Sequence, residues 1–171
     1  TKGMKGGGIT EMGEMSEAGC VAFSDDGLPV SSSDVMRAAL EYSAFHGSFI
    51  INHSQDCSLC RNGHMNEGQM SMKLGIKGMP REQEEIMISR DMLLAKLTGG
   101  HIHIAHVSSA WSLKLIETAK KGAAESSALG YLKAVENQVV INVVDTSKED
   151  IVDGEYEVSQ LSTKGVSVKG N

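Results

Sequence analysis

The sequence contains no apolar run of the length needed to cross a membrane and no excess of basic residues. Its 171 residues include 16 Lys and Arg against 22 Asp and Glu, a formal net charge of −6. A nucleic-acid partner usually requires a basic face, so this balance argues against one. A membrane-spanning helix needs about 18 or more consecutive apolar residues, and no such stretch is present. We therefore predict neither a nucleic-acid partner nor a membrane span.

Cysteine is also scarce, and no segment resembles a secretion signal. The three thiols are Cys20, Cys57 and Cys60, and residues 1–8 lack an apolar core. An odd number of cysteines without a secretion signal is typical of a reduced, cytoplasmic protein, which is our prediction.

Short apolar runs alternate with helical patterns along the first two thirds of the chain. The predicted elements are helix 9–18, strand 20–24, helix 33–45, strand 48–52, polar loop 54–79, helix 80–97, strand 101–105 and helix 108–120. This alternation indicates parallel strands joined by right-handed helical crossovers, and therefore an α/β fold. After Gly122 the character changes. A helix over 123–135 and a strand over 139–145 are predicted there, followed by a polar stretch.

Three polar residues, Asp26, His53 and His106, each stand just past one of the predicted strands. In a parallel α/β barrel, residues at the carboxyl ends of different strands converge although they are far apart in sequence. One carboxylate and two imidazoles are a ligand set that Zn²⁺ accepts. A single histidine is more often an ordinary surface or core residue, but three such residues at equivalent positions favour a metal site.

Five linked segments carry a resemblance to a known enzyme family. They are residues 22–27 with an Asp-Asp-Gly turn, 52–56 with a His-x-x-Asp turn, 65–68 with Asn-Glu-Gly, 84–91, and 98–108 with Ile-Ala-His-Val-Ser. In this order and at these intervals, the segments resemble the dihydroorotases of the amidohydrolase superfamily. The resemblance covers residues 1–122.

The resemblance implies a fold and a ligand set. It implies a partial (β/α)₈ TIM-type barrel over residues 1–122, with 123–171 a diverged helix plus a small C-terminal β segment. Zinc would lie at the barrel mouth, with two ions per site in an intact family member. Asp26 would bridge the two ions, and His53 and His106 would bind the second. Asp25, the neighbour of Asp26, would either stabilise the turn or support the metal ligands without binding the metal.

The resemblance also implies a reaction. It is the zinc-dependent interconversion of dihydroorotate and N-carbamoyl-L-aspartate in de novo pyrimidine biosynthesis. The family's first-strand His-x-His-x-Arg motif and its general-base aspartate are not in this sequence, so no catalytic residue is assigned. Gln55 replaces the family's glutamate. A complete barrel needs about 250 residues, so we expect an incomplete chain, a sequence covering only part of a structure, or a degenerate homologue.

Two alternative functions stay open. One is a non-catalytic dihydroorotase-like subunit that supports aspartate transcarbamoylase, which the missing motif and Gln55 favour. The other is a different cyclic-amide hydrolase, such as an allantoinase or a hydantoinase, against which Asp26 in place of a lysine argues. A homodimer is a further possible assembly of the protein.

Two further groups of residues are candidate metal ligands. Alternation places His101 and His103 on one face of their strand, opposite to His106, and we interpret them as structural or helix-facing. Cys57 and Cys60 form a Cys-x-x-Cys pair with His64 close by. Such a pair can be half of a zinc site or a redox pair, but two further ligands are missing, so we do not favour a cysteine site.

Overall fold

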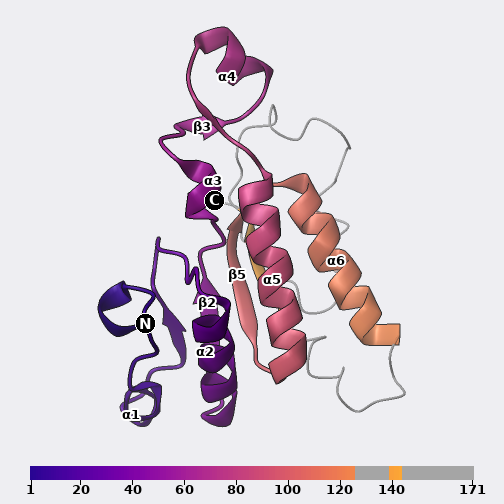
Figure 1. Cartoon of the computed structure of the whole chain (residues 1–171). Helices are drawn as coiled ribbons and strands as arrows, with labels where there is room; N and C mark the ends of the chain where they lie inside the picture. Colours follow the sequence, from indigo (N-terminus) through magenta and orange to yellow (C-terminus); the bar gives the residue numbers. More distant parts are fainter. Residues whose placement is uncertain (126–138, 144–171) are drawn as a thin grey trace.

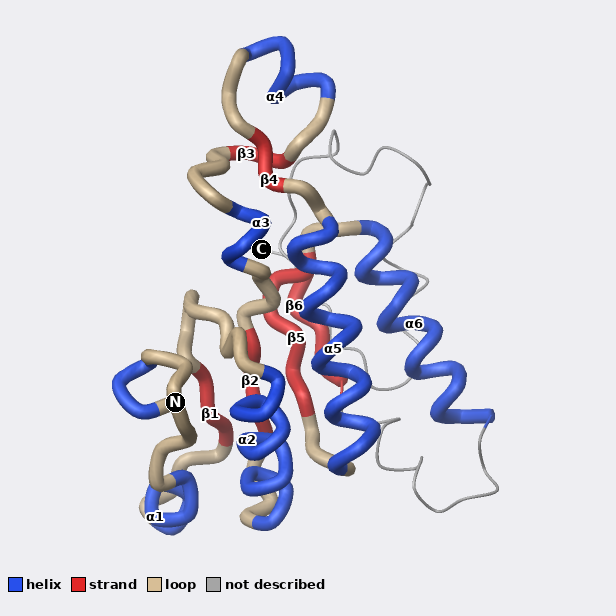
Figure 2. The backbone as a smooth tube through the Cα atoms, viewed as in Figure 1, coloured by secondary structure: helices blue, strands red, loops and turns tan. Residues whose placement is uncertain are grey.

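The computed structural model describes residues 1–125 and 139–143, and its centre is a parallel β-sheet. The strands are β1 (Ala22–Ser24), β2 (Phe49–Asn52), β5 (Ile102–Val107) and β6 (Val139–Val143). They lie side by side in chain order, and each neighbouring pair is parallel (Figure 2). The carboxyl ends of these strands therefore lie at one edge of the sheet.

One face of the sheet is covered by the helices that connect successive strands (Figure 1). They are α2 (Ser33–Phe45), α5 (Glu82–Thr98) and α6 (Ala110–Glu125), and α5 packs against the other two. None of the described helices has the length and apolar character needed to span a membrane.

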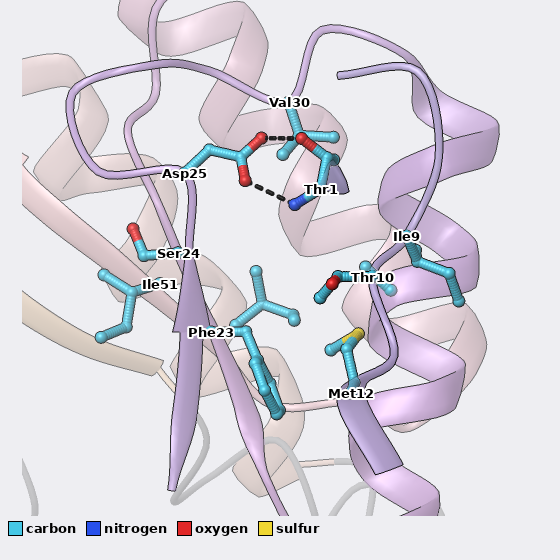
Figure 3. Close-up of a pocket in the computed structure, with 11 residues that line it drawn as sticks. Thr1, Ile9, Thr10, Met12, Phe23, Ser24, Asp25, Val30 and Ile51 are labelled. Atoms are coloured by element: carbon cyan, nitrogen blue, oxygen red, sulfur yellow. Dashed lines mark hydrogen bonds and ion pairs between the residues drawn. The ribbon is translucent and has the colours of Figure 1, made fainter. Parts of the chain in front are cut away.

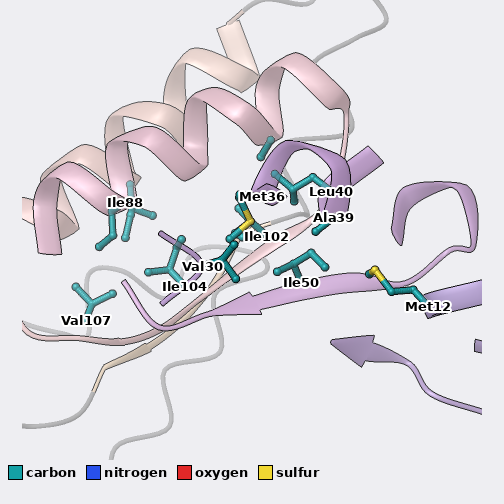
Figure 4. Packing of buried hydrophobic residues seen from close by; sticks show 12 residues of the cluster. Met12, Val30, Met36, Ala39, Leu40, Ile50, Ile88, Ile102, Ile104 and Val107 are labelled. Atoms are coloured by element: carbon teal, nitrogen blue, oxygen red, sulfur yellow. The ribbon is translucent and has the colours of Figure 1, made fainter. Parts of the chain in front are cut away.

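The hydrophobic core lies between these helices and the sheet (Figure 4). Its fully buried side chains come from alternate strand positions and from one face of each helix, and they include Met36, Leu40, Ile88, Ile102, Ile104 and Ile116. Burial of each such side chain stabilises the fold by about 1.5–3 kcal/mol. These buried side chains form the layer that supports β2 and β5.

The α/β class predicted from the sequence is confirmed, and most element boundaries shift by only a few residues. The helix predicted from about residue 33 to about residue 45 is confirmed as α2. The N-terminal helix is shorter than predicted, as α1 (Met12–Glu17). The strand predicted at 139–145 is β6, which pairs with β5. The remainder of the predicted helix over 123–135, and most of the predicted small β segment, lie outside the described residues.

The polar loop predicted at 54–79 needs correction, because it contains short regular elements. They are α3 (Cys57–Cys60), β3 (Met65–Asn66), α4 (Gln69–Leu74) and β4 (Gly78–Met79), and β3 and β4 pair in parallel. We call residues 56–80 the excursion, since it projects beyond the end of β2 (Figure 1). Gly78 permits the close approach of its strands: a Cβ there would lie 2.4 Å from Cα of Glu67.

A second glycine determines how closely α2 approaches the start of β5. A Cβ at Gly100 would lie 2.8 Å from the carbonyl oxygen of Leu40 and 2.9 Å from its Cβ. We expect Gly100→Ala to lower the free energy of unfolding by about 1–3 kcal/mol, because the backbone must shift to accept the methyl group. Chemical denaturation would measure this. Gly7→Ala, where no atom lies within 4 Å of the added Cβ, should change the free energy by less than about 0.5 kcal/mol. Equal effects of the two variants would contradict the prediction.

Candidate metal centre

The side chains of His53 and His106 meet at the carboxyl edge of the sheet. His53 follows directly after β2, and His106 lies near the end of the adjacent strand β5. Nδ1 of His53 and Nε2 of His106 are 2.7 Å apart, and the ring centroids are 4.5 Å apart. Both residues are half-buried. Pairing of two neighbouring parallel strands thus brings together imidazoles that are 53 positions apart in the sequence.

An irregularity at the end of β5 turns His106 toward His53. The register between β5 and β6 shifts between Ile104 and Val107, and His106 has a φ of 36°. A positive φ is uncommon for any residue except glycine, and such local breaks in a strand re-aim a side chain. Simple alternation of faces therefore does not extend to His106.

Of the two interpretations of His101 and His103, structural or helix-facing, the structure favours the structural one. Ile102 and Ile104 occupy the helix-covered face (Figure 4), so the two histidines lie on the opposite face. There both rings stack with Phe49, at centroid distances of 4.6 Å for His101 and 6.5 Å for His103. Burial lowers the pKa of both imidazoles. We interpret them as packing residues.

Asp26 lies in the turn after β1 and is not brought together with the two histidines. Its backbone has a φ of 55°, and its amide donates to Oγ of Ser24 at 2.8 Å. The described residues contain no group of three or more His, Cys, Asp or Glu side chains placed to hold a metal ion. Among those residues, nothing pairs with the Asp26 carboxylate, which is exposed. The structure therefore assembles two of the three predicted ligands.

The neighbouring carboxylate, Asp25, points away from this edge into a small pocket (Figure 3). It is buried and accepts hydrogen bonds from the amino group of Thr1, at 2.5 Å, and from the Thr1 hydroxyl. The pocket is otherwise lined mainly by apolar side chains such as Phe23, Val30 and Met12. The Asp25 carboxylate thus binds Thr1 on the helix side of the sheet, whereas Asp26 lies at the carboxyl edge of the sheet.

The donor atoms of the histidine pair are of the type that zinc binds, but their 2.7 Å separation is that of a hydrogen bond. Two nitrogens bound to one zinc at about 2.0–2.1 Å lie about 3.3 Å apart, so the rings would have to separate slightly to hold the ion. Two imidazole nitrogens point at each other, and neutral imidazole is a common zinc ligand. With no metal bound, this contact requires one ring to donate a proton to the other. A cation between the rings would use both lone pairs instead.

Comparison with known proteins places this chain in a family. The family model described as dihydro-orotase-like matches residues 1–112. The chain belongs to the dihydroorotase-like family. It is 52% identical over 121 residues to a dihydroorotase of Endomicrobium trichonymphae, a match that covers 71% of this chain and 29% of that protein. It is also 52% identical over 120 residues to a dihydroorotase of Pelotomaculum thermopropionicum, covering 70% and 28%. The matched part is less than a third of either relative.

Solved structures show the same fold at much lower sequence identity. A D-hydantoinase superimposes with a TM-score of 0.58 at 17% identity, covering 82% of this chain and 30% of the other. A dihydropyrimidinase from Brevibacillus agri gives a TM-score of 0.52 at 13% identity, covering 76% and 27%. The dihydroorotase-like chain thus shares its strand and helix arrangement with part of these proteins.

Gln55, which the sequence analysis compared with a glutamate of the dihydroorotases, contacts His53 of the histidine pair directly. Its Oε1 lies 2.9 Å from Nε2 of His53. If this oxygen accepts the Nε2 proton, Nδ1 carries the lone pair, and Nδ1 is the atom that faces His106. Partners of this kind fix the tautomer and ring orientation of metal-binding histidines. A neutral amide does this without adding a negative charge.

Two carboxylates of α5 hold the turn that follows His106. Glu84 accepts hydrogen bonds from the amides of Ser108 and Ser109, both at 2.9 Å, and from the Ser108 hydroxyl at 2.6 Å. Glu85 accepts from the Ser109 hydroxyl at 2.6 Å. Both carboxylates are largely buried. Glu84 satisfies two amides at the start of α6, as an N-terminal cap would, and Glu85 holds the Ser109 hydroxyl beside them. Both residues belong to the segment 84–91, but their pattern in the sequence does not predict this contact with the turn.

The cysteines of α3 lie in the excursion. Cys57 is exposed, and Cys60 is half-buried with its thiol donating to Oε1 of Gln83 at 3.3 Å. Burial raises the pKa of Cys60, which disfavours the thiolate that a metal ligand or nucleophile requires. Both thiols are free.

Proposed function

We propose that the protein is a zinc-dependent cyclic-amide hydrolase that interconverts dihydroorotate and N-carbamoyl-L-aspartate, as the names of its relatives suggest. The observation that carries this proposal is the convergence of His53 and His106 at the carboxyl ends of adjacent parallel strands, inside the region that matches the family model. Zinc dependence, the substrate and a role in pyrimidine biosynthesis are all parts of the proposal.

We also infer that the sheet is one arc of a (β/α)₈ barrel. Strands in chain order with helices on one face support this, because a doubly wound sheet reverses its strand order and carries helices on both faces. The likeness to hydantoinase structures supports it as well. Catalytic groups of such barrels lie at the carboxyl edge, where His53, His106 and Asp26 stand.

In the proposed mechanism, the imidazoles of His53 and His106 would hold the zinc ion, and the exposed carboxylate of Asp26 would be the third ligand. Bound zinc supplies Lewis-acid polarisation of the ring amide and a water that ionises near neutral pH. Gln55 keeps the proton of His53 on Nε2, and Glu84 holds the turn behind His106. Hydrolysis adds water across the amide: the carbonyl carbon gains an oxygen, the ring C–N bond breaks, and the nitrogen takes a proton.

Hydrolysis of dihydroorotate by the purified full natural protein tests this proposal. We expect bound zinc by elemental analysis, activity at neutral to alkaline pH, loss of activity on chelation, and recovery when zinc is added back. A folded protein that neither binds zinc nor hydrolyses dihydroorotate would overturn the proposal. Stable co-purification of such a protein with aspartate transcarbamoylase would instead support the non-catalytic subunit.

A further inference from the structure

A closed circuit of hydrogen bonds joins three segments near the candidate metal centre. Arg90 of α5 donates from Nη1 to the carbonyl oxygens of Val30 and Ser31, at 2.8 and 2.9 Å. Its Nη2 and Nε donate to Oδ1 of Asp91, at 2.6 and 2.9 Å. Nδ2 of Asn52 donates to Oδ2 of Asp91 at 2.5 Å, and the amide of Val30 donates to Oδ1 of Asn52 at 3.4 Å. We call these five residues the Arg90 circuit.

The charged centre of the Arg90 circuit is buried, whereas Ser31 at its rim is exposed. Asp91 is 0% exposed and Asn52 is 1% exposed, and the side chain of Arg90 retains 15%. Burial raises the pKa of Asp91, and the Arg90 guanidinium opposes this shift. A buried ion pair is often no more stabilising than well-packed apolar side chains of the same volume. Stability alone therefore does not explain why this site is polar.

The position of the Arg90 circuit suggests what it does. The backbone pairing of β1 with β2 ends at Ser24 and Ile51, so the ladder stops before Asp26 and His53. Asn52 directly precedes His53, and Val30 lies in the loop that follows Asp26. The circuit continues the connection between these two segments past the end of the ladder, and it anchors both to α5.

We propose that Arg90, Asp91 and Asn52 are positioning residues that set the spacing between Asp26 and His53, and thereby the affinity of the site for zinc. This inference rests on the proposed function, because it assigns both residues to one metal site. A purely structural role would give variants that melt earlier but bind zinc as before. A positioning role changes zinc affinity in a protein that is still folded.

Zinc affinity of full-length variants, measured by competition with a chromophoric chelator, tests the inference. Arg90→Lys keeps the positive charge but loses the fork that reaches Asp91 and both carbonyls at once. We expect zinc binding to weaken by about 10- to 100-fold, the range found when partners of metal ligands are removed. Arg37→Lys, which alters an exposed ion pair with Glu41 on α2, is the matched control and should leave the affinity unchanged.

A second variant covers the case in which Arg90→Lys does not fold. Asn52→Ser keeps the Arg90–Asp91 pair but is too short to join it to Val30, so we expect the same weakening. The absorption spectrum of the cobalt-substituted protein should also change, because ligand geometry changes. Unaltered zinc affinity and cobalt spectrum in either folded variant would overturn the inference. A wild-type protein that binds no zinc would instead overturn the proposed function.

Discussion

His53→Ala should abolish dihydroorotate hydrolysis and remove most of the bound zinc from the full natural protein. The substitution deletes the imidazole whose Nδ1 lies 2.7 Å from Nε2 of His106, and it leaves one nitrogen of the pair. Loss of a single oxyanion-stabilising group costs about 10²- to 10³-fold in rate. We therefore expect kcat/KM to fall by about 10³-fold or more, because loss of the metal removes both the Lewis acid and the activated water.

The control for this prediction is another histidine of the same chain. His64 is exposed in the excursion, and its amide donates to the Lys77 carbonyl, an interaction that the side chain does not make. His64→Ala should retain activity and zinc. Full activity of His53→Ala, with its zinc content unchanged, would show that the histidine pair is not a metal centre. His106→Ala should behave as His53→Ala does.

Glu84→Ala should produce the largest loss of stability among the polar substitutions considered. The Glu84 carboxylate accepts three hydrogen bonds from Ser108 and Ser109, and alanine leaves the Ser109 amide buried without an acceptor. An unsatisfied buried group costs about 1–3 kcal/mol, so with the partly buried Ser108 amide we expect a loss of about 2–4 kcal/mol. Chemical denaturation followed by circular dichroism would measure it.

Two variants on the same helix separate lost hydrogen bonds from lost charge. Glu84→Gln keeps one acceptor oxygen and should give an intermediate loss. Glu82→Ala removes an exposed carboxylate whose ion pair in the described part of the chain is with exposed Arg81, so its effect should stay below about 0.5 kcal/mol. If Glu84→Ala proved as mild as Glu82→Ala, the Ser108–Ser109 turn would not depend on Glu84. A further expectation is weaker zinc binding in Glu84→Ala, because this turn follows His106.

The sequence predicted the layer architecture well because that architecture follows from long apolar patterns. Residues 33–45 carry apolar side chains at helical spacing, and they form α2 close to the predicted bounds. The approach of His53 to His106 also follows from a general rule, since parallel strands end at the same edge. The position of Asp26 is harder to predict, because its distance from the histidines depends on the conformation of a turn. Its role as a ligand stays a prediction.

Other features depend on tertiary contacts that the pattern of apolar and polar residues along the sequence does not reveal. His106 turns toward His53 through a register shift in β5, whereas alternation placed it on the face opposite to His101 and His103. Glu84 and Asp91 look like the solvated face of a helix, yet both are buried against partners distant in sequence. The excursion has strands of two residues, which are too short to show a period. In each case tertiary contacts determined the outcome.

The root of the excursion has a consequence for how this fold can diversify. The Asp56 amide donates to the Gln83 carbonyl at 2.9 Å, so the segment leaves and rejoins the sheet-and-helix layer at one place. Lengthening a loop whose ends are already joined costs little entropy, and surface segments of this kind tolerate insertion. Evolution can therefore remodel or exchange residues 56–80 as a cassette. The ends of β2 and β5, which carry His53 and His106, can stay the same while a changed excursion admits a different substrate.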